Sequence, residues 1–396
     1  MATLKIVPTG LNVGTFNSEL LRPQLPRRTA TGGQRSRVNI RAVSAPVQQA
    51  LEYRKLGDSD LLVSEITLGT MTWGNQNSES EAHEQLSFWL ASETCRDVGS
   101  AFGDDIDGKV NWLQYPIPMS GDTQGRTEQY IGNWLKTMPR DKVIVATKVA
   151  GYSERYQYLR EGGGVTRVNK KNIKEAVEGS LKRLGTDHID LLQIHWPDRY
   201  VPLFGEYMYN TEKWRPSVPF QEQLEAMQEV IQEGKVRYIG VSNETSFGVM
   251  EFLHAAKTLD LVEVCSPQNG NVGLLAYSPL SGGTLSGKYV SDQITEGTKT
   301  WRLNMFPGYM ARYRKSLAKA AVEAYLQVAN RHNMSLVQLA LAFGRDRPFM
   351  TSNILGATSM EQLKENISAY QVPRPLAREI EEDIEAVFKK YRDPTI

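Results

Sequence analysis

The chain has 396 residues, 40% of them apolar, so it can bury a core the size of one large domain or two smaller ones. Its 46 basic and 45 acidic residues nearly cancel, and no overall charge favours a nucleic acid or a membrane surface as partner. Two widely separated cysteines and five histidines without zinc-ligand spacing predict neither a disulfide framework nor a metal site. No run reaches the roughly 18 apolar residues of a membrane-spanning helix, so we expect no membrane insertion.

The first 51 residues differ in composition from the rest of the chain. Glu19 is the one acidic residue among seven basic residues, interleaved with Ser, Thr, Gly and Pro. Acid-poor, Arg-rich and hydroxyl-rich N-termini are typical of organelle transit peptides, and the alternative is a disordered basic tail. We expect residues 1–51 to be such a segment, with the mature protein beginning near residues 42 to 44 and the fold, residues 52–396, near Glu52. Because this segment shows little amphipathic helical period, we expect it to direct the protein to the chloroplast stroma rather than to the mitochondrion.

Short β-branched runs alternate with amphipathic helical stretches after residue 52. The clearest helix is predicted to begin at Asn172, a good N-cap, and to end at Gly185. The stretch from Ser87 to Gln114 shows neither helical nor strand period, and Gly162 to Gly164 predict a surface loop. The predicted strands cover 63–70, 142–148, 189–195, 236–242, 273–278 and 352–357, and the other predicted helices cover 220–233, 246–257, 314–332, 336–344, 360–369 and 376–391.

This alternation predicts a parallel-sheet α/β protein, and the length of residues 52–396 suits a (β/α)8 TIM barrel. Six predicted strands leave two unaccounted for, so the barrel is expected to be irregular at its second and sixth strands. A doubly wound dinucleotide-binding fold is the competing architecture, but the chain has no GxGxxG between a first strand and a helix.

Two titratable side chains stand at predicted strand ends: Lys148 closes Val143 to Lys148, and His195 closes Ile189 to His195. In a parallel barrel the active site is built where the strands end, so both are candidate catalytic groups. Taken one at a time, Lys148 is also compatible with a strand-end lysine that reaches solvent, and His195 with a hydrogen-bonded core histidine.

Several motifs in order and spacing make the chain similar to the aldo-keto reductases, in the branch close to potassium-channel β-subunits and their plant and bacterial relatives. Together they cover most of residues 52–392. They are Leu56-Gly57, Leu68-Gly69-Thr70-Met71, Tyr115 to Gly132 with Gly125-Arg-Thr-Glu128, Ala146-Thr147-Lys148, Leu192-Gln193-Ile194-His195-Trp196, Ile239-Gly240-Val241-Ser242-Asn243, Ala276-Tyr277-Ser278-Pro279-Leu280, and Leu355-Gly356-Ala357-Thr358 through Gln362 to Asn366.

This resemblance implies hydride transfer from NADPH to an aldehyde or ketone, with a tyrosine as proton donor. By position Tyr115 would be that acid, Lys148 would be the cation that lowers its pKa, and His195 would orient the carbonyl oxygen. Without the resemblance, Tyr115 before Pro116 is an ordinary loop tyrosine.

The resemblance also implies the residues that hold the cofactor. Ser242, Asn243 and Gln268 would meet the carboxamide, and a helix N-terminus would favour phosphate at the adenosine end. The other matching residues are Thr70 and Met71 beside the nicotinamide, Tyr277, Ser278, Pro279, Leu280, Gly282 and Lys288 along the pyrophosphate, and Gly356, Thr358, Gln362, Glu365 and Asn366 at the adenosine end. For Thr358 alone, capping of the helix near Met360 is the other interpretation.

Two stretches depart from the family pattern. The family has a lysine-pairing aspartate five residues before the tyrosine, where this chain has Val110. A buried lysine without its carboxylate tends to deprotonate, which weakens its hold on the tyrosine. Between Asn243 and Gly273 the chain is too short for a full βα unit after helix 246–257. Either residues 258–265 are a remnant of the sixth helix and the strand is omitted, or residues 261–269, with Gln268, take the place of the sixth strand.

The sequence leaves two functions open. A third alternative is that the chain does not fold stably, because an open barrel exposes unpaired strand edges. The first is an NADPH-dependent oxidoreductase that acts on small carbonyl substrates. The second is an NADPH-binding, catalytically weakened barrel that serves as a redox-sensing or structural partner, which the missing aspartate favours. Substrate identity and oligomeric state are not predicted.

Overall fold

The computed structural model describes residues 51–395 except positions 58, 204, 207, 307 and 309 and residues 92–109, 112–123, 263–271 and 291–293. For Val110 and Asn111 it describes the backbone alone. The residues from Gln48 on belong to one compact unit. None of the described helices is long and apolar enough to cross a membrane.

The predicted strand 63–70 is wrong as one element, because the chain changes its pairing partner at Glu65. Before that residue, β2 (Leu62–Ser64) pairs antiparallel with β1 (Tyr53–Lys55). After it, β3 (Ile66–Leu68) pairs parallel with β10 (Met350–Leu355), the last strand of the chain. First and last parallel strands are therefore neighbours, as they are in a barrel.

The parallel strands fall into separate ladders. β6 (Ala146–Val149), β7 (Ile189–Ile194) and β8 (Val236–Val241) form one sheet, while β3, β10 and β9 (Leu274–Tyr277) form another. The second strand is present as β4 (Val110–Asn111), which pairs parallel with β5 (Val143–Ile144). Within the described residues no ladder joins β8 to β9 or β3 to β4, so the described strands do not close a barrel.

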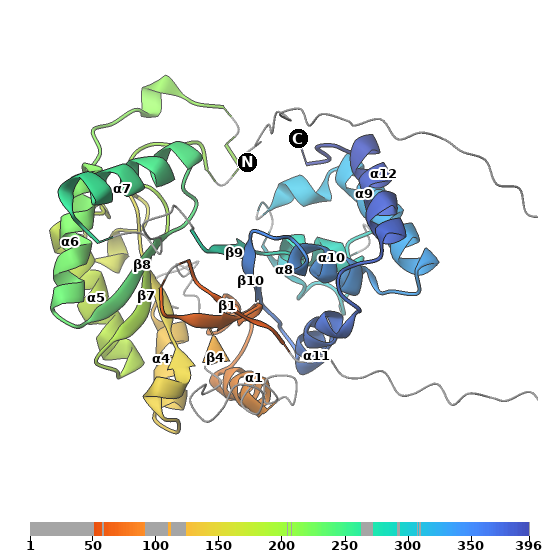
Figure 1. Cartoon of the computed structure of the whole chain (residues 1–396), viewed down its shortest axis with the longest axis horizontal. Coiled ribbons are helices and arrows are strands. Elements are labelled where there is room, and N and C mark those ends of the chain that lie inside the picture. Colours follow the sequence, from red (N-terminus) through yellow and green to blue (C-terminus); the bar gives the residue numbers. More distant parts are fainter. Residues whose placement is uncertain are drawn as a thin grey trace, which may run out of the picture. The chain divides into compact units, whose positions relative to one another are not determined.

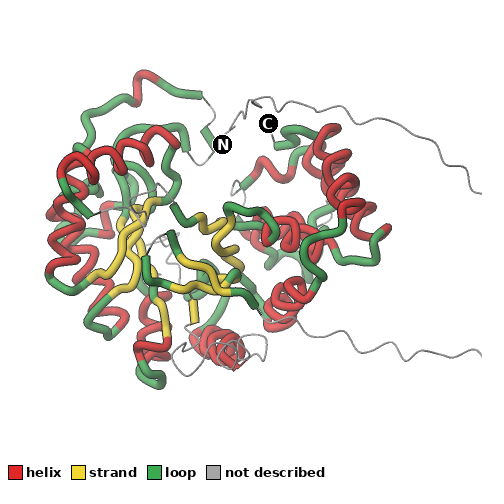
Figure 2. Tube along the Cα trace, in the orientation of Figure 1, coloured by secondary structure: helices red, strands yellow, loops and turns green. Residues whose placement is uncertain are grey.

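The helices follow the strands along the chain. α5, α6 and α7 pack side by side in chain order on the outer side of the β6–β8 sheet (Figures 1 and 2). The helices are α1 (Glu79–Ala91), α4 (Arg126–Leu135), α5 (Lys170–Leu184), α6 (Phe220–Gln232), α7 (Ser246–Leu259), α8 (Arg302–Met305), α9 (Ser316–Arg331), α10 (Leu336–Arg345), α11 (Met360–Ser368) and α12 (Arg378–Lys390).

Three sequence-based expectations about helices are corrected. Neither α1 nor α4 was predicted, and the last five residues of α1 fall in the stretch from Ser87 that appeared aperiodic. Helix α5 has Asn169 as its N-cap, whose side chain accepts from the Asn172 N–H at 3.0 Å, so Asn172 lies inside the helix and not at its start. Gly185 does end α5, in a left-handed conformation. After α7, Asp260 is left-handed and residues 261–262 are not helical, which argues against a helical remnant there.

Alternation along the strands separates two apolar layers. One face of β6 and β7 packs under the helices, with Val149, Leu192 and Ile194 in the main core. The opposite face, with Ala146 and Leu191, packs against residues of the β1–β2 hairpin. The hairpin thus supplies an apolar floor beneath the inner faces of the strands, in the cluster Leu56, Leu61, Val63, Ile144, Ala146 and Leu191 with Tyr238 and Leu275.

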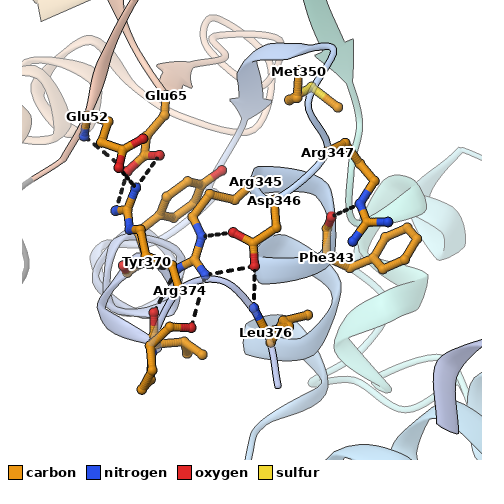
Figure 3. Close-up of polar contacts among 12 residues, drawn as sticks. Glu52, Glu65, Phe343, Arg345, Asp346, Arg347, Met350, Tyr370, Arg374 and Leu376 are labelled. Carbon is orange, nitrogen blue, oxygen red and sulfur yellow. Dashed lines mark hydrogen bonds and ion pairs between the residues drawn. The ribbon is translucent and has the colours of Figure 1, made fainter. Parts of the chain in front are cut away.

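A network of charged side chains around buried Glu65 ties the first described strand to the last part of the chain (Figure 3). Arg374 donates to both carboxylate oxygens of Glu65, at 3.0 and 2.8 Å, and lies 2.9 Å from a carboxylate oxygen of Glu52. Arg54 donates to the Met350 carbonyl at 2.5 Å. The folded unit is therefore anchored from Glu52 onward.

This anchoring predicts where the chain can be shortened. A variant that begins at Ser44 is expected to melt cooperatively at the Tm of the full chain, because the network begins at Glu52. A variant that begins at Leu56 loses β1, Glu52 and Arg54 and is expected to melt at a clearly lower temperature, because β2 loses its antiparallel partner and the Met350 carbonyl loses its Arg54 donor. Thermal unfolding followed by circular dichroism distinguishes the two. A lower Tm for the Ser44 variant would show that the N-terminal segment takes part in the fold.

Candidate functional site

The inner face of the β6–β8 sheet changes from apolar to polar as the strands approach their carboxyl ends. Ala146, Leu191 and Tyr238 stand in one register row. Two residues further along, Lys148, Gln193 and Gly240 form the next row. Because side chains alternate with a period of two, both rows face the same way and the second lies above the apolar floor.

Lys148 is buried, with 7% of its surface exposed, and does not reach solvent as a strand-end lysine can. Its Nζ donates to the Gln193 Oε1 at 2.7 Å. Among the described residues it has no carboxylate within ion-pair distance. Burial lowers the pKa of Lys148 to about 7, as expected for a buried lysine without an acidic partner.

His195 lies just beyond the end of β7 and is half-buried. Its Nδ1 is buried without a hydrogen-bond partner among the described residues, which disagrees with a hydrogen-bonded core histidine. Burial first, and the neighbouring Lys148 charge second, hold the pKa of His195 well below its ordinary value. A neutral imidazole with an unused nitrogen can donate to or accept from a substrate oxygen, depending on its tautomer.

The end of β8 completes this first group of residues. The Ser242 N–H donates to the Ile194 carbonyl at 2.8 Å, and the Asn243 amide donates to the His195 carbonyl at 2.9 Å. Asn243 is left-handed, with φ of 54°, a conformation that asparagine adopts more readily than most residues. The structure therefore brings Lys148, His195, Ser242 and Asn243 together at the ends of three adjacent strands.

A second group lies at the ends of β3 and β9. Thr70 is fully buried, and Met71 beside it is half-buried. The Tyr277 hydroxyl lies 3.4 Å from the Met71 sulfur, and an Arg302 nitrogen lies 3.9 Å from the same atom. Arg302 also donates to Gln76 at 3.3 Å. Arg302, the first residue of the short helix α8, and Gln76, in the turn after β3, were not predicted, because neither belongs to a recognisable motif.

The loop after β9 crowds two cations together. Ser278, Ser281 and Gly282 are left-handed, and the Gly282 N–H donates to the Ser278 hydroxyl at 2.8 Å. Lys288 crosses Gly283 so closely that a Cβ on this glycine would lie 2.9 Å from the Lys288 Cε. Burial first, and then Arg302, lower the pKa of Lys288.

Neither Lys288 nor Arg302 has a carboxylate partner among the described residues. Two neighbouring cations without an acidic partner favour a bound anion. Pro279 and Leu280 belong to the same loop, and Leu280 packs against the main core.

The predicted adenosine-end residues follow β10. Ser359, not Thr358, caps α11, since its side chain accepts from the Gln362 N–H. Thr358 instead donates through its N–H and its hydroxyl to the Gln362 Oε1, at 3.0 and 3.1 Å. Asn366 is buried and Glu365 is exposed. A Cβ added to Gly356 would lie 3.3 Å from the Gly69 carbonyl oxygen, so the two backbones pass close to each other.

Two predicted site residues, Tyr115 and Gln268, lie outside the described residues. Val110, which stands where the family has its aspartate, pairs with Val143. Val143 precedes Lys148 by five residues on the same chain, so position 110 lies below the lysine row and about 16 Å from it along the strand direction.

Gln193 is the site residue that the sequence analysis missed as a functional position. Its signal was available, because it precedes His195 by two residues and so shares a strand face with it. What the sequence could not give is the register that sets Gln193 opposite Lys148.

Parallel strands with polar residues at their carboxyl ends define an α/β protein with a candidate site at that edge, and comparison with known proteins identifies its family. The chain matches the Aldo/keto reductase family over residues 65–264 and 248–387 and belongs to that family. The family implies a (β/α)8 barrel, oxidoreductase activity and a nicotinamide cofactor, generally NADPH.

Among individual relatives, the chain is 40% identical over 365 residues to Protein tas of Escherichia coli, covering 87% of this chain and 99% of the bacterial protein. It is 40% identical over 283 residues to an aldo-keto reductase of Babesia bovis, covering 64% and 98%. It is 27% identical over 362 residues to a probable voltage-gated potassium channel subunit beta of Arabidopsis thaliana, covering 86% and 97%.

The comparisons also bear on the short segment after α7. The 365 aligned positions with Protein tas exceed 87% of 396 residues, so the relative has residues at positions where this chain has none. The two family matches overlap at residues 248–264, next to the place where the sequence is too short for a sixth βα unit. The overlap of the two family matches is what a loss of sequence near the sixth strand would produce.

Proposed function

We propose that this chain is an NADPH-dependent reductase of aldehyde or ketone groups in small molecules. The observation that carries the proposal is the cluster at the carboxyl ends of β6 to β8, where buried Lys148, half-buried His195 and exposed Asn243 lie together above an apolar floor. Family membership supplies the class of reaction, and this cluster supplies groups that can act on a carbonyl oxygen.

The residues near β9 fit a phosphate-bearing cofactor. Lys288 and Arg302 offer positive charge without a described acidic partner, and the left-handed Gly283 brings backbone close to Lys288. Ser242 and Asn243 offer hydroxyl and amide groups for a carboxamide. When bound there, NADPH would supply the hydride for the carbonyl carbon.

The chain's own residues would manage the proton and the oxygen. Tyr115, placed by family resemblance, would donate a proton to the carbonyl oxygen as charge develops on it. Lys148 in its charged form would lower the pKa of that phenol. His195, neutral because its pKa is well below the ordinary value, would hydrogen-bond the oxygen and fix its direction.

The test uses the chain from Ser44 with NADPH and a generic aromatic aldehyde. Quenching of tryptophan fluorescence measures NADPH binding, and loss of NADPH absorbance measures turnover. We expect Tyr115→Phe to keep NADPH binding and to lower kcat about 10²- to 10⁴-fold, the usual contribution of a general acid. Tyr325→Phe, a change on α9, is the matched control and should leave kcat unchanged. An unchanged kcat in Tyr115→Phe would refute the assignment of the acid.

The second candidate function is an NADPH-binding barrel with weakened catalysis that serves as a redox-sensing or structural partner. The neutral partner of Lys148 favours it, because a lysine with a pKa near 7 is only partly charged at physiological pH. NADPH binding without turnover across a panel of aldehydes and ketones would support this function and contradict the first.

We also propose that residues 1–51 direct the protein to the chloroplast stroma. The Arg-rich, acid-poor composition supports the proposal. Fusion of residues 1–51 to a fluorescent protein should yield a processed, stromal product in plant cells. A cytosolic or mitochondrial product of unchanged length would contradict it.

A further inference from the structure

The partner of Lys148 is an uncharged amide, and the surrounding chain fixes that amide in place. Gln193 is 8% exposed and lies opposite Lys148 on one side and Gly240 on the other. A Cβ added to Gly240 would lie 3.3 Å from the Gln193 Cγ, a tight contact. The bare backbone at position 240 therefore leaves the space in which the glutamine side chain runs towards the lysine.

Among the described residues, the acidic side chains on the strand and helix next to Lys148 bind other partners. On β7, Asp190 accepts from Arg140 at 2.8 Å and from Arg237 of β8 at 2.9 Å. On α4, Glu128 accepts from Arg183 at 2.5 Å and from the Thr147 hydroxyl at 2.7 Å. Thr147 and Lys148 are consecutive residues of a strand, so their side chains point to opposite faces.

Just after the end of β7, His195 lies close enough to Lys148 for the lysine charge to lower the pKa of the histidine. Tyr238, one row below on β8, donates its hydroxyl to Asp60 at 2.6 Å. Among the described residues, Gln193 is thus the one hydrogen-bond acceptor of the lysine.

We propose that Gln193 is the positioning residue for Lys148: its amide oxygen directs the ammonium at the carboxyl end of the strands, in the space that Gly240 leaves, and takes the place of a carboxylate partner. A neutral acceptor satisfies one lysine proton without adding a negative charge. The lysine therefore titrates within the physiological range, whereas a carboxylate would hold it charged. The catalytic consequence rests on the proposed reductase function, but the titration itself does not.

The experiment measures the titration of Lys148 directly. Protein with isotope-labelled lysine is titrated by NMR through the Cε and Nζ resonances, and Lys148→Met identifies the resonance. Gln193→Glu places a carboxylate at nearly the same atoms and is expected to raise the pKa of Lys148 by about 1–3 units. Gln193→Leu removes the acceptor and is expected to lower it, because the charged form loses its hydrogen bond.

Two further variants separate positioning from general packing. Gly240→Ala crowds the Gln193 Cγ and is expected to shift the titration in the direction of Gln193→Leu. Gln223→Leu is the matched control, since it removes another buried glutamine, which donates to the Val218 carbonyl at 2.7 Å. It should leave the Lys148 titration unchanged.

Activity gives the second readout. A step that needs the charged lysine is lost as the pH rises through the lysine pKa, so Gln193→Glu is expected to extend turnover to higher pH. Equal Lys148 titrations in wild type, Gln193→Glu and Gln193→Leu would overturn the proposal, whatever the activity. If the shifts occur and no variant turns over a carbonyl, the positioning role stands and the reductase function fails.

Discussion

Lys148→Met is expected to abolish most carbonyl reduction and at the same time to stabilise the fold. Burial lowers the pKa of this lysine from 10.5 to about 7, so the folded state disfavours its charged form. Removing the charge relieves that cost, and Met fills a similar volume. We expect a gain of about 2–4 kcal/mol in the free energy of unfolding at pH 6, while kcat falls about 10²- to 10⁴-fold.

The lowered pKa of Lys148 also determines how the stability of the wild type changes with pH. Between pH 7 and 10.5 the unfolded chain binds a proton at Lys148 that the folded chain has released, so the wild type gains stability as the pH rises through that range. Below pH 7 the full destabilisation is present. His195 adds a further loss of stability below its ordinary pKa of 6.5, because its folded pKa lies well below that value.

Urea unfolding at several pH values between 6 and 10 tests the prediction. Lys148→Met should flatten the rise in stability above pH 7, and its advantage over wild type should shrink as the pH increases. Lys136→Met, at an exposed lysine that donates to Asn133, is the control and should follow the wild-type curve. A pH-independent difference between Lys148→Met and wild type would show that Lys148 is not the titrating group.

Arg345→Ala is expected to be the most destabilising single change outside the candidate site. The Arg345 side chain is 0% exposed and donates to both oxygens of Asp346, at 2.7 and 3.1 Å. It also donates to the Tyr370, Val372 and Pro373 carbonyls (Figure 3). Its removal leaves a buried carboxylate and three carbonyls without these donors, a cost of about 3–5 kcal/mol.

Arg347→Ala provides a control two residues away. Arg347 is partly exposed, pairs with Glu381 and lies over the Phe343 ring, so its loss should cost about 1 kcal/mol or less. Chemical denaturation of both variants gives the comparison. Equal losses for Arg345→Ala and Arg347→Ala would mean that burial does not govern the strength of this network.

The sequence predicted the parallel strands well and some of the helices poorly, for identifiable reasons. β7 and β8 are short segments rich in Ile, Val and Leu between clear helical stretches, so their positions followed directly. α1 was missed because its buried face includes Gln85, which accepts from the Trp73 indole at 3.2 Å and donates to the Ala357 carbonyl at 3.2 Å. A buried polar residue interrupts the apolar period, although its hydrogen bonds satisfy it inside the core.

The candidate site was predictable to the extent that it lies at strand ends. Lys148 and His195 were found from position alone, and the lowered pKa of Lys148 was anticipated from the missing aspartate. The contact with Gln193 and the pair Lys288 and Arg302 depend on register and loop conformation. Both arise from residues distant in sequence, which local pattern cannot place.

The most direct test of the whole account is the reduction of a generic aldehyde by the chain from Ser44, followed by the loss of NADPH absorbance. We expect steady consumption of NADPH that requires both the protein and the aldehyde. The Lys148→Met variant should lose most of this consumption. A cooperatively folded protein that binds NADPH and consumes none with any aldehyde or ketone would contradict it.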